Sequence, residues 1–425
     1  MNQIAIVGLG YVGLPLALQF ARSGAKVLGL DIDSKKTDAI LAGRSYIKHV
    51  SGDDMSAHIA SGALDASTDF SRIGEVDAVI LCVPTPLNHF REPDLSYVLK
   101  TGEAIAPFLR DGALIVLEST TYPGTTDGEL REVLEAGSGK KAGTDFHLAF
   151  SPEREDPGNP DSKVASIPKV VGGLTPECLE KALQLYSIAI QKLVPVSSCR
   201  VAEASKLLEN IFRSVNIALV NELKVVYGAM DIDIWEVIEA AKTKPFGFMP
   251  FYPGPGLGGH CIPIDPFYLT WKAREFGQHT RFIELAGEIN TAMPDHVVKV
   301  SFEALNNDAK AIKGAKILLL GLAYKANVDD DRESPTYKLI EKFEDLGGEV
   351  FYHDPFVPVI PMTREHAKYA GRQSEAEVTG DYDLIVLSTG HDVYKEHDFS
   401  GYGIPLVDTR NAVPVGNRPT NYYKA

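Results

Sequence analysis

The sequence predicts an α/β protein, with two doubly wound Rossmann-like domains joined by a helical central domain that contains a long helix. Three observations predict this fold. A β-branched run at the start feeds into a glycine-rich turn and an apolar helix, strand-like apolar runs return late in the chain, and the middle has helical periodicity. The chain is longer than one ordinary domain, so we expect three domains. They span residues 1–200, 201–305 and 306–425.

The first strand, turn and helix predict a dinucleotide site. Residues 4–7 form a strand, Gly8-Leu9-Gly10-Tyr11-Val12-Gly13 is a GxGxxG turn, and the next strand ends at Asp31. The turn alone is weak evidence, and a glycine turn of another α/β fold is the alternative. Here it follows a strand, opens a helix, and precedes an acidic residue that can bind the adenosine ribose. A carboxylate at Asp31 repels a 2′-phosphate, which favours NAD over NADP, and Lys36 is expected at the ribose or diphosphate.

Three later apolar runs read as buried parallel strands, at residues 78–83, 113–117 and 148–150. Each is followed by a polar or proline-marked loop, and these loops contain Thr85, Thr120 and Glu153. Ligands of doubly wound sheets bind beyond the carboxyl ends of the strands, so we expect these loops at the ligand site.

From Val201 to Met230 the pattern is that of one long helix, and a second helical block runs from about Arg281 to Leu305. Lys206 and Asn210 are four residues apart, so one helix face presents an ammonium and an amide together, although a solvated face is the alternative. The apolar positions of the long helix are too many for a helix in solvent. We therefore expect an isologous homodimer built on it, with further assembly left open.

The last part of the chain predicts a second doubly wound sheet, with strands at residues 315–321, 349–355 and 383–388. Its first turn, Gly321 to Lys325, lacks the GxGxxG pattern. We expect this domain to bind something other than the adenosine half of a dinucleotide.

Cys261 stands in a loop that begins with Gly258 and Gly259, ahead of Asp265-Pro266, which read as the N-cap and first residue of a helix to Phe276. A thiolate near a helix N-terminus is a good nucleophile, and glycines let a substrate approach the main chain. A small buried residue in a turn is the alternative.

Composition limits the partners and the compartment. The net charge of −15 and the pI near 5.2 argue against nucleic acid as a partner. Four cysteines at unrelated spacings indicate neither disulfides nor a zinc site, and we expect no metal. The sequence contains no apolar stretch of about 18 residues, so we expect a cytoplasmic protein without a membrane partner.

Several separated motifs together resemble the UDP-glucose/GDP-mannose dehydrogenase family over nearly the whole chain. They are the GLGYVGLP turn, Ser119-Thr120, Ser151-Pro152-Glu153, the helix segment Glu203 to Asn210, the Gly-Gly-His-Cys loop and Asp331 to Pro335. The resemblance implies oxidation of the C6 alcohol of a nucleotide sugar to a carboxylate, in two steps with two NAD and one water. Cys261 would hold the aldehyde as a thiohemiacetal and the acyl group as a thioester.

The resemblance also assigns the remaining site residues. Lys206 and Asn210 would stabilise the oxyanion, Glu153 would be the general base of hydrolysis, Thr120 would bind the water, and Asp265 would orient the water or the lysine. The expected cofactor contacts are Gly8, Gly10, Tyr11, Val12, Gly13, Asp31, Lys36, Thr85, Thr120 and Arg332. The expected contacts to the UDP-sugar are Arg154, Lys206, Asn210, Tyr252, Gly258, Lys325 and Arg410.

Two departures bear on the substrate. Arg154 follows the Pro-Glu pair where UDP-glucose dehydrogenases carry an aromatic residue, and Ile264 precedes Asp265 where they carry a lysine. Both resemble the N-acetylhexosamine branch, and UDP-N-acetylglucosamine is the expected substrate. UDP-N-acetylmannosamine, UDP-N-acetylgalactosamine and UDP-glucose are the alternatives, and a catalytically silent nucleotide-sugar binder or a two-electron hydroxyacid dehydrogenase are the rival classes.

Overall fold

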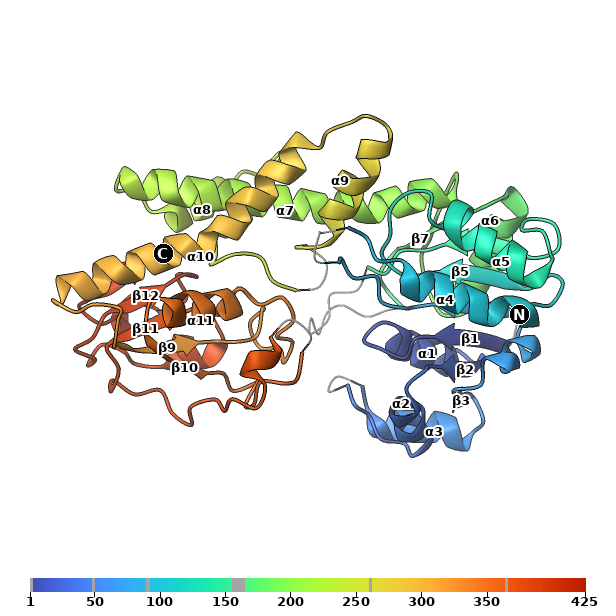
Figure 1. Ribbon diagram of the computed structural model, residues 1–425, viewed down its shortest axis with the longest axis horizontal. Coiled ribbons are helices and arrows are strands. Elements are labelled where there is room, and N and C mark those ends of the chain that lie inside the picture. Colours follow the sequence, from blue (N-terminus) through green and yellow to red (C-terminus); the bar gives the residue numbers. More distant parts are fainter. Residues whose placement is uncertain (1–2, 48–49, 89–91, 155–164, 260–261, 364–365) are drawn as a thin grey trace. The chain divides into compact units, whose positions relative to one another are not determined.

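The computed structural model describes residues 3–47, 50–88, 92–154, 165–259, 262–363 and 366–425. The chain divides into two compact units, Met1–Glu209 with Phe267–His279, and Asn210–Pro266 with Thr280–Ala425. Each unit contains its own sheet (Figure 1). Cys261, the expected nucleophile, lies outside the described residues.

The first unit is built on a sheet of eight strands among the described residues, in the order β3-β2-β1-β4-β5-β6-β7-β8. All neighbours are parallel except β6 and β7, which are antiparallel. The strands are β1 (Gln3–Val7), β2 (Lys26–Leu30), β3 (Leu64–Ser67), β4 (Ala78–Leu81), β5 (Leu114–Leu117), β6 (His147–Phe150), β7 (Lys169–Gly173) and β8 (Leu193–Val196). The first six follow the strand order of dinucleotide-binding folds, as the sequence predicts.

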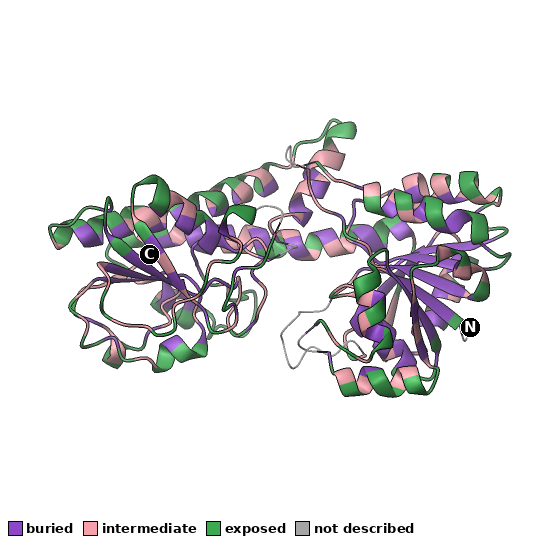
Figure 2. Cartoon of the chain, turned by 60° about the horizontal axis from the view of Figure 1, so that its bottom comes forward, coloured by how far each residue is buried: buried purple, intermediate pink, exposed green. Residues whose placement is uncertain are grey.

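Helices pack on this sheet and bury its apolar strands, most of which are purple, the colour of buried residues, in Figure 2. They are α1 (Gly13–Arg22), α2 (Ser34–Leu41), α3 (Gly52–Ala60), α4 (Ser96–Ile105), α5 (Arg131–Ser138) and α6 (Pro176–Tyr186). Because helices cover both faces, β1, β4 and β5 alternate between two cores and read as continuous apolar runs.

The long helix α7 (Cys199–Ala229) has 31 residues and runs from the first unit into the second. The predicted helix at Val201–Met230 is therefore confirmed to within two residues at each end. The second unit also holds α8 (Ile234–Ala241) and α10 (Arg281–Asn307), which packs against α11 (Pro335–Asp345). The helix α9 (Asp265–Glu275) begins at Asp265 itself, one residue earlier than the predicted start.

The second unit contains a parallel sheet in the order β10-β9-β11-β12-β13. Its strands are β9 (Lys316–Leu320), β10 (Glu349–His353), β11 (Leu384–Leu387), β12 (Leu406–Asp408) and β13 (Tyr422–Lys424), and a short helix, α12 (Asp392–Glu396), follows β11. The expectation of a second doubly wound domain is confirmed. In the described part of the chain, no helix has the length and apolarity that a membrane crossing requires.

Candidate active site

The glycine turn between β1 and α1 is shaped by two close backbone contacts. A Cβ on Gly8, whose φ is +93°, would lie 2.4 Å from the carbonyl oxygen of Cys82. A Cβ on Gly13 would lie 1.9 Å from the carbonyl oxygen of Gly8. Gly10, in contrast, has nothing within 4 Å of its Cβ position. Two glycines are thus needed for packing, while the third leaves backbone open at a helix N-terminus, where a pyrophosphate fits.

Asp31 ties this turn to the end of β2. Its carboxylate accepts hydrogen bonds from the backbone N–H of Leu9 at 2.9 Å and of Asp33 at 3.0 Å, and only 5% of the residue is exposed. Lys36 Nζ lies 3.0 Å from the same carboxylate, so the lysine expected at the ribose or diphosphate is paired with Asp31. Asp31 stands at the tip of the second strand, where a dinucleotide ribose is bound in such folds.

The other expected cofactor residues of the first unit occupy the turn and the loops beyond β4 and β5. Tyr11 is 37% exposed, Val12 and Thr120 are half-buried, and Thr85 is buried. The carbonyl oxygen of Thr85 accepts a hydrogen bond from the hydroxyl of Tyr268, which fixes that loop. This arrangement fits NAD in the first unit.

Arg332 belongs to the second unit. Its guanidinium forms an ion pair with Asp330 at 2.6 Å, and its carbonyl oxygen accepts a hydrogen bond from Gly259 N–H at 3.1 Å. Its expected contact with the cofactor diphosphate stays a prediction.

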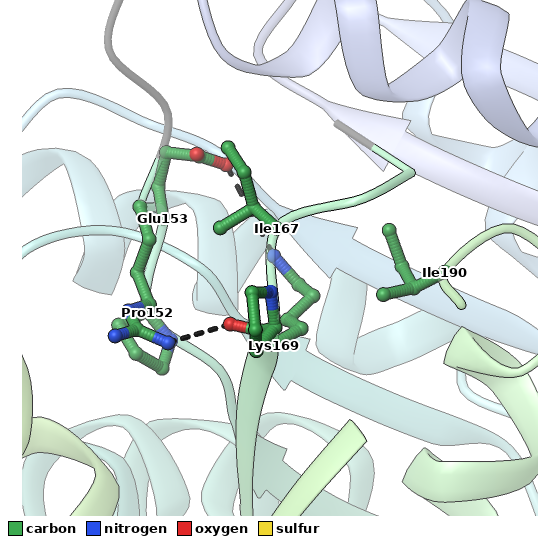
Figure 3. A pocket seen from close by; sticks show the side chains of 7 residues that line it. Pro152, Glu153, Ile167, Lys169 and Ile190 are labelled. Atoms are coloured by element: carbon green, nitrogen blue, oxygen red, sulfur yellow. Dashed lines mark hydrogen bonds and ion pairs between the residues drawn. The ribbon is translucent and has the colours of Figure 1, made fainter. Parts of the chain in front are cut away.

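Glu153 lies in a pocket of the first unit at the carboxyl end of β6 (Figure 3). The pocket is lined by Pro152, Glu153, Arg154, Ile167, Pro168, Lys169 and Ile190. Figure 3 shows the Glu153 carboxylate directed toward the Lys169 ammonium, 4.0 Å away. Lys206 Nζ donates to the carbonyl oxygen of Glu153 at 2.5 Å, so the structure brings two of the expected catalytic residues together.

Behind Glu153 lies a buried ion pair that the sequence analysis did not identify. Lys169 Nζ is 2.5 Å from the carboxylate of Glu118, whose other oxygen accepts a hydrogen bond from the Tyr186 hydroxyl at 2.5 Å. Burial raises the pKa of Glu118 to about 7, against the opposing charge of Lys169. Burial lowers the pKa of Lys169, but the carboxylates of Glu118 and Glu153 outweigh it, so the lysine stays charged.

Arg154, expected at the sugar, is held by protein groups. Its guanidinium forms an ion pair with Glu209 on α7 at 2.8 Å and donates to the carbonyl oxygen of Pro168 at 2.6 Å. Both contacts fix the start of the loop after Glu153 against the first unit.

In the second unit, Asn210 and Asp265 meet. The Asn210 amide donates to the Asp265 carboxylate at 2.5 Å, and the two residues are 4% and 1% exposed. Because amide nitrogen has two hydrogens, one donor remains for another acceptor. The cysteine that precedes Asp265 by four residues is outside the described residues.

The remaining expected substrate residues are also in the second unit. A Cβ on Gly258 would lie 2.7 Å from Tyr324 Cβ, so only glycine fits there. The Tyr252 hydroxyl donates to Glu239 at 2.8 Å, and the residue is 44% exposed. Lys325 and Arg410 are half-buried after β9 and β12, and the Arg410 guanidinium donates to the carbonyl oxygen of Ser388 at 3.0 Å. No group of three or more metal-binding side chains occurs among the residues described.

The strand order, the open backbone at Gly10 and the acidic residue at the tip of β2 define a dinucleotide-dependent enzyme. Models of the UDP-glucose/GDP-mannose dehydrogenase family match its NAD binding domain at residues 2–190, its central domain at 200–292 and its UDP binding domain at 318–414. The chain belongs to this family. It is an NAD-dependent nucleotide-sugar dehydrogenase, as the sequence motifs predict.

Relatives with different named substrates match at similar levels. A UDP-N-acetyl-D-glucosamine 6-dehydrogenase of Pseudomonas aeruginosa is 36% identical over 92% of this chain and 91% of its own length. An NDP-N-acetyl-D-galactosaminuronic acid dehydrogenase of Ralstonia nicotianae is 34% identical over 93% and 92%. The solved structure of a UDP-D-ManNAc dehydrogenase from Pyrococcus horikoshii superposes with a TM-score of 0.91 at 32% identity, over 99% of this chain and 98% of that one.

The buried ion pair leads to a stability prediction. Lys169→Met leaves Glu118 buried without its counter-charge, so we expect the free energy of unfolding to fall by roughly 3–5 kcal/mol. The double variant Glu118→Gln/Lys169→Met removes both charges and should lose clearly less. Denaturant titration measures both, with Lys100→Met, a change at an exposed residue of α4, as the matched control. A single variant no less stable than the double one would contradict the proposed pairing.

Proposed function

We propose that this enzyme oxidises the C6 alcohol of UDP-N-acetyl-D-glucosamine to the uronic acid, for synthesis of a surface polysaccharide. NAD is the hydride acceptor for both oxidations. The observation that carries the proposal is the anchoring of Lys206 and Asn210, which stand one turn apart on α7. One donates to the main chain of Glu153 and the other to Asp265, which are the residues expected to handle water and protons.

In this proposal, Cys261 attacks the aldehyde carbon, and the resulting thiohemiacetal loses a second hydride to become a thioester. Lys206 and Asn210 donate to the substrate oxygen that carries negative charge in the tetrahedral states. Glu153 removes a proton from the water that hydrolyses the thioester, Thr120 holds that water, and Asp265 orients the Asn210 amide. The ammonium of Lys169 lies 4.0 Å from the Glu153 carboxylate and helps to hold it at the pocket.

We also propose the division of labour among the domains. Residues 1–200 hold NAD, 201–305 carry the catalytic helix, and 306–425 hold the UDP-sugar with Lys325 and Arg410. Arg154, Tyr252 and Gly258 are proposed to line the sugar. A cytoplasmic location is supported by Cys82, Cys178 and Cys199, which are free thiols and fit a reduced compartment.

A substrate panel tests the proposal. UDP-N-acetylglucosamine, UDP-N-acetylmannosamine, UDP-N-acetylgalactosamine and UDP-glucose are each supplied with NAD and with NADP, and NADH or NADPH is followed by absorbance. We expect the highest kcat/KM with UDP-N-acetylglucosamine and NAD, with two cofactor molecules reduced per sugar. The two N-acetyl epimers are the second candidates, because relatives named for them match almost as well. One cofactor reduced per sugar would sink the four-electron reaction.

The covalent route makes a prediction for Cys261. Cys261→Ser should stall after the first oxidation or at an ester, because a serine ester hydrolyses far more slowly than a thioester. Intact-mass spectrometry with UDP-N-acetylglucosamine and NAD should show an adduct at one equivalent, and Cys261→Ala should show none. Uronic acid produced by either variant at the wild-type rate would make the cysteine merely structural.

We propose a homodimer built on α7. Large apolar side chains recur on its exposed face at the heptad-like spacing of a helix contact, and those of Leu208 and Leu219 are 67% and 49% exposed. The side chains with this spacing are those of Val201, Leu208, Phe212, Leu219 and Val226 on α7, and Met230 directly follows the helix. Such a stripe is typical of a self-associating surface.

The dimer proposal predicts an effect of charge on this stripe. Light scattering at micromolar concentration should give twice the chain mass for the wild type and a lower mass for Leu219→Glu. Phe276→Glu is the matched control, since Phe276 is 70% exposed but lies outside α7. A wild-type protein of monomeric mass would refute the dimer.

A further inference from the structure

Lys224 on α7 is a buried lysine without a partner. Only 5% of the residue is exposed, and its Nζ has no hydrogen-bond acceptor. No ion pair to it occurs in the described chain. Burying an ammonium without compensation is costly, so such a residue is expected where a ligand supplies the missing charge.

A second cation, in the segment after β12, is close enough for its charge to act on Lys224. The charge of Arg410 acts on Lys224, and the Nη1 atom of Arg410 lies 2.3 Å from where a Cβ on Gly254 would stand. The N–H of Gly254 donates at 3.0 Å to Asn221, three residues before Lys224 on α7. The backbone at Gly254 therefore contacts α7, which carries Lys224, and also lies against the guanidinium of Arg410.

The carboxylate beside Arg410 is already engaged. Asp408, the carboxylate that acts on Arg410, accepts from the backbone N–H of Arg410 and Val413 and from the hydroxyl of Tyr422 at 2.9–3.0 Å. The charge of Lys224 also acts on His296 of α10, and burial first and that lysine second lower the pKa of His296 to about 4. The neighbourhood is therefore basic, with Lys299 as a further charge near His296.

We propose that Lys224 is a second phosphate-binding cation, which acts with Arg410 on the diphosphate of the nucleotide sugar. An ammonium and a guanidinium together match a diphosphate, the first as a point charge and the second as a fork of donors. Arg410 stands within the stretch matched by the family's UDP binding domain. The inference rests on the proposed function only for the identity of the ligand.

Phosphate binding at Lys224 couples affinity to pH. Burial first and Arg410 second lower the pKa of Lys224 from 10.5 to about 7, so the unfolded chain binds the extra proton between these values. The free protein therefore gains stability as pH rises through that window. A bound phosphate favours the ammonium and raises the pKa again, so binding takes up a proton. The affinity for the phosphate ligand should fall as the pH rises above about 7, because free Lys224 then loses its proton. A phosphate, with a second pKa of about 6, no longer titrates in that range.

Calorimetric titration of the full chain with UDP, uridine and inorganic phosphate tests the proposal. Lys224→Met should weaken UDP by about tenfold or more, the loss expected for one hydrogen bond to a charged group, and leave uridine unchanged. At about pH 8, wild-type heats in two buffers of different ionisation enthalpy should reveal proton uptake, which Lys224→Met should abolish. Lys338→Met removes an exposed charge on α11 of the same unit and should change neither.

Thermal unfolding separates binding from a structural role. The free Lys224→Met protein should be at least as stable as the wild type, because it no longer buries an unpaired charge. Equal UDP affinity in wild type and Lys224→Met would overturn the proposal, as would phosphate binding that depends on Lys224 and persists under saturating UDP. UDP binding needs no turnover, so failure of the substrate panel would leave this result standing.

Discussion

The need to satisfy buried and half-buried polar groups along one face of α7 organises the loops of both units. Five polar residues lie on one side of this helix because they are spaced by three, four, eleven and three residues. They are Glu203, Lys206, Asn210, Asn221 and Lys224. Each of the first four forms a hydrogen bond to another segment. Glu203 holds the loop after β5, and Lys206 holds the loop that carries the candidate base. Asn210 holds the first turn of α9, and Asn221 holds the glycine loop before the cysteine. The fifth, Lys224, makes no hydrogen bond to a loop.

The cost of this arrangement is visible at Glu203. It is fully buried and accepts hydrogen bonds from Gly124 and Thr126, yet burial still raises its pKa to about 7. Burying these polar side chains costs free energy, and four of the five offset that cost because each fixes a loop that follows a strand or precedes a helix. The hydrogen bonds that satisfy the polar side chains of α7 are thus the same ones that position the candidate catalytic groups.

The sequence predicted the elements that have a strong local signal. The buried strands β1, β4, β5, β9 and β11 are apolar runs, and α7 is a sustained periodic pattern. The strand β8 was missed because its residues are only half-buried and include a proline, which suits a sheet edge but breaks the strand pattern. The pair of Glu118 and Lys169 was missed because 51 residues separate its members, and no periodicity links them. Contacts of that kind follow from strand order, which one sequence does not reveal.

In both sheets an aspartate accepts hydrogen bonds from the turn after the first strand, but the two turns differ in how much backbone they expose. In the second unit Asp354 at the end of β10 accepts from the N–H of Leu322 and Ala323 after β9, as Asp31 accepts from Leu9 in the first unit. Gly321 has the positive φ that Gly8 has. The second turn, however, buries Ala323 completely, whereas the first exposes bare backbone at Gly10. The same hydrogen bond therefore closes both turns, but only the first keeps room for a pyrophosphate, which supports the expectation that the second sheet serves a different ligand.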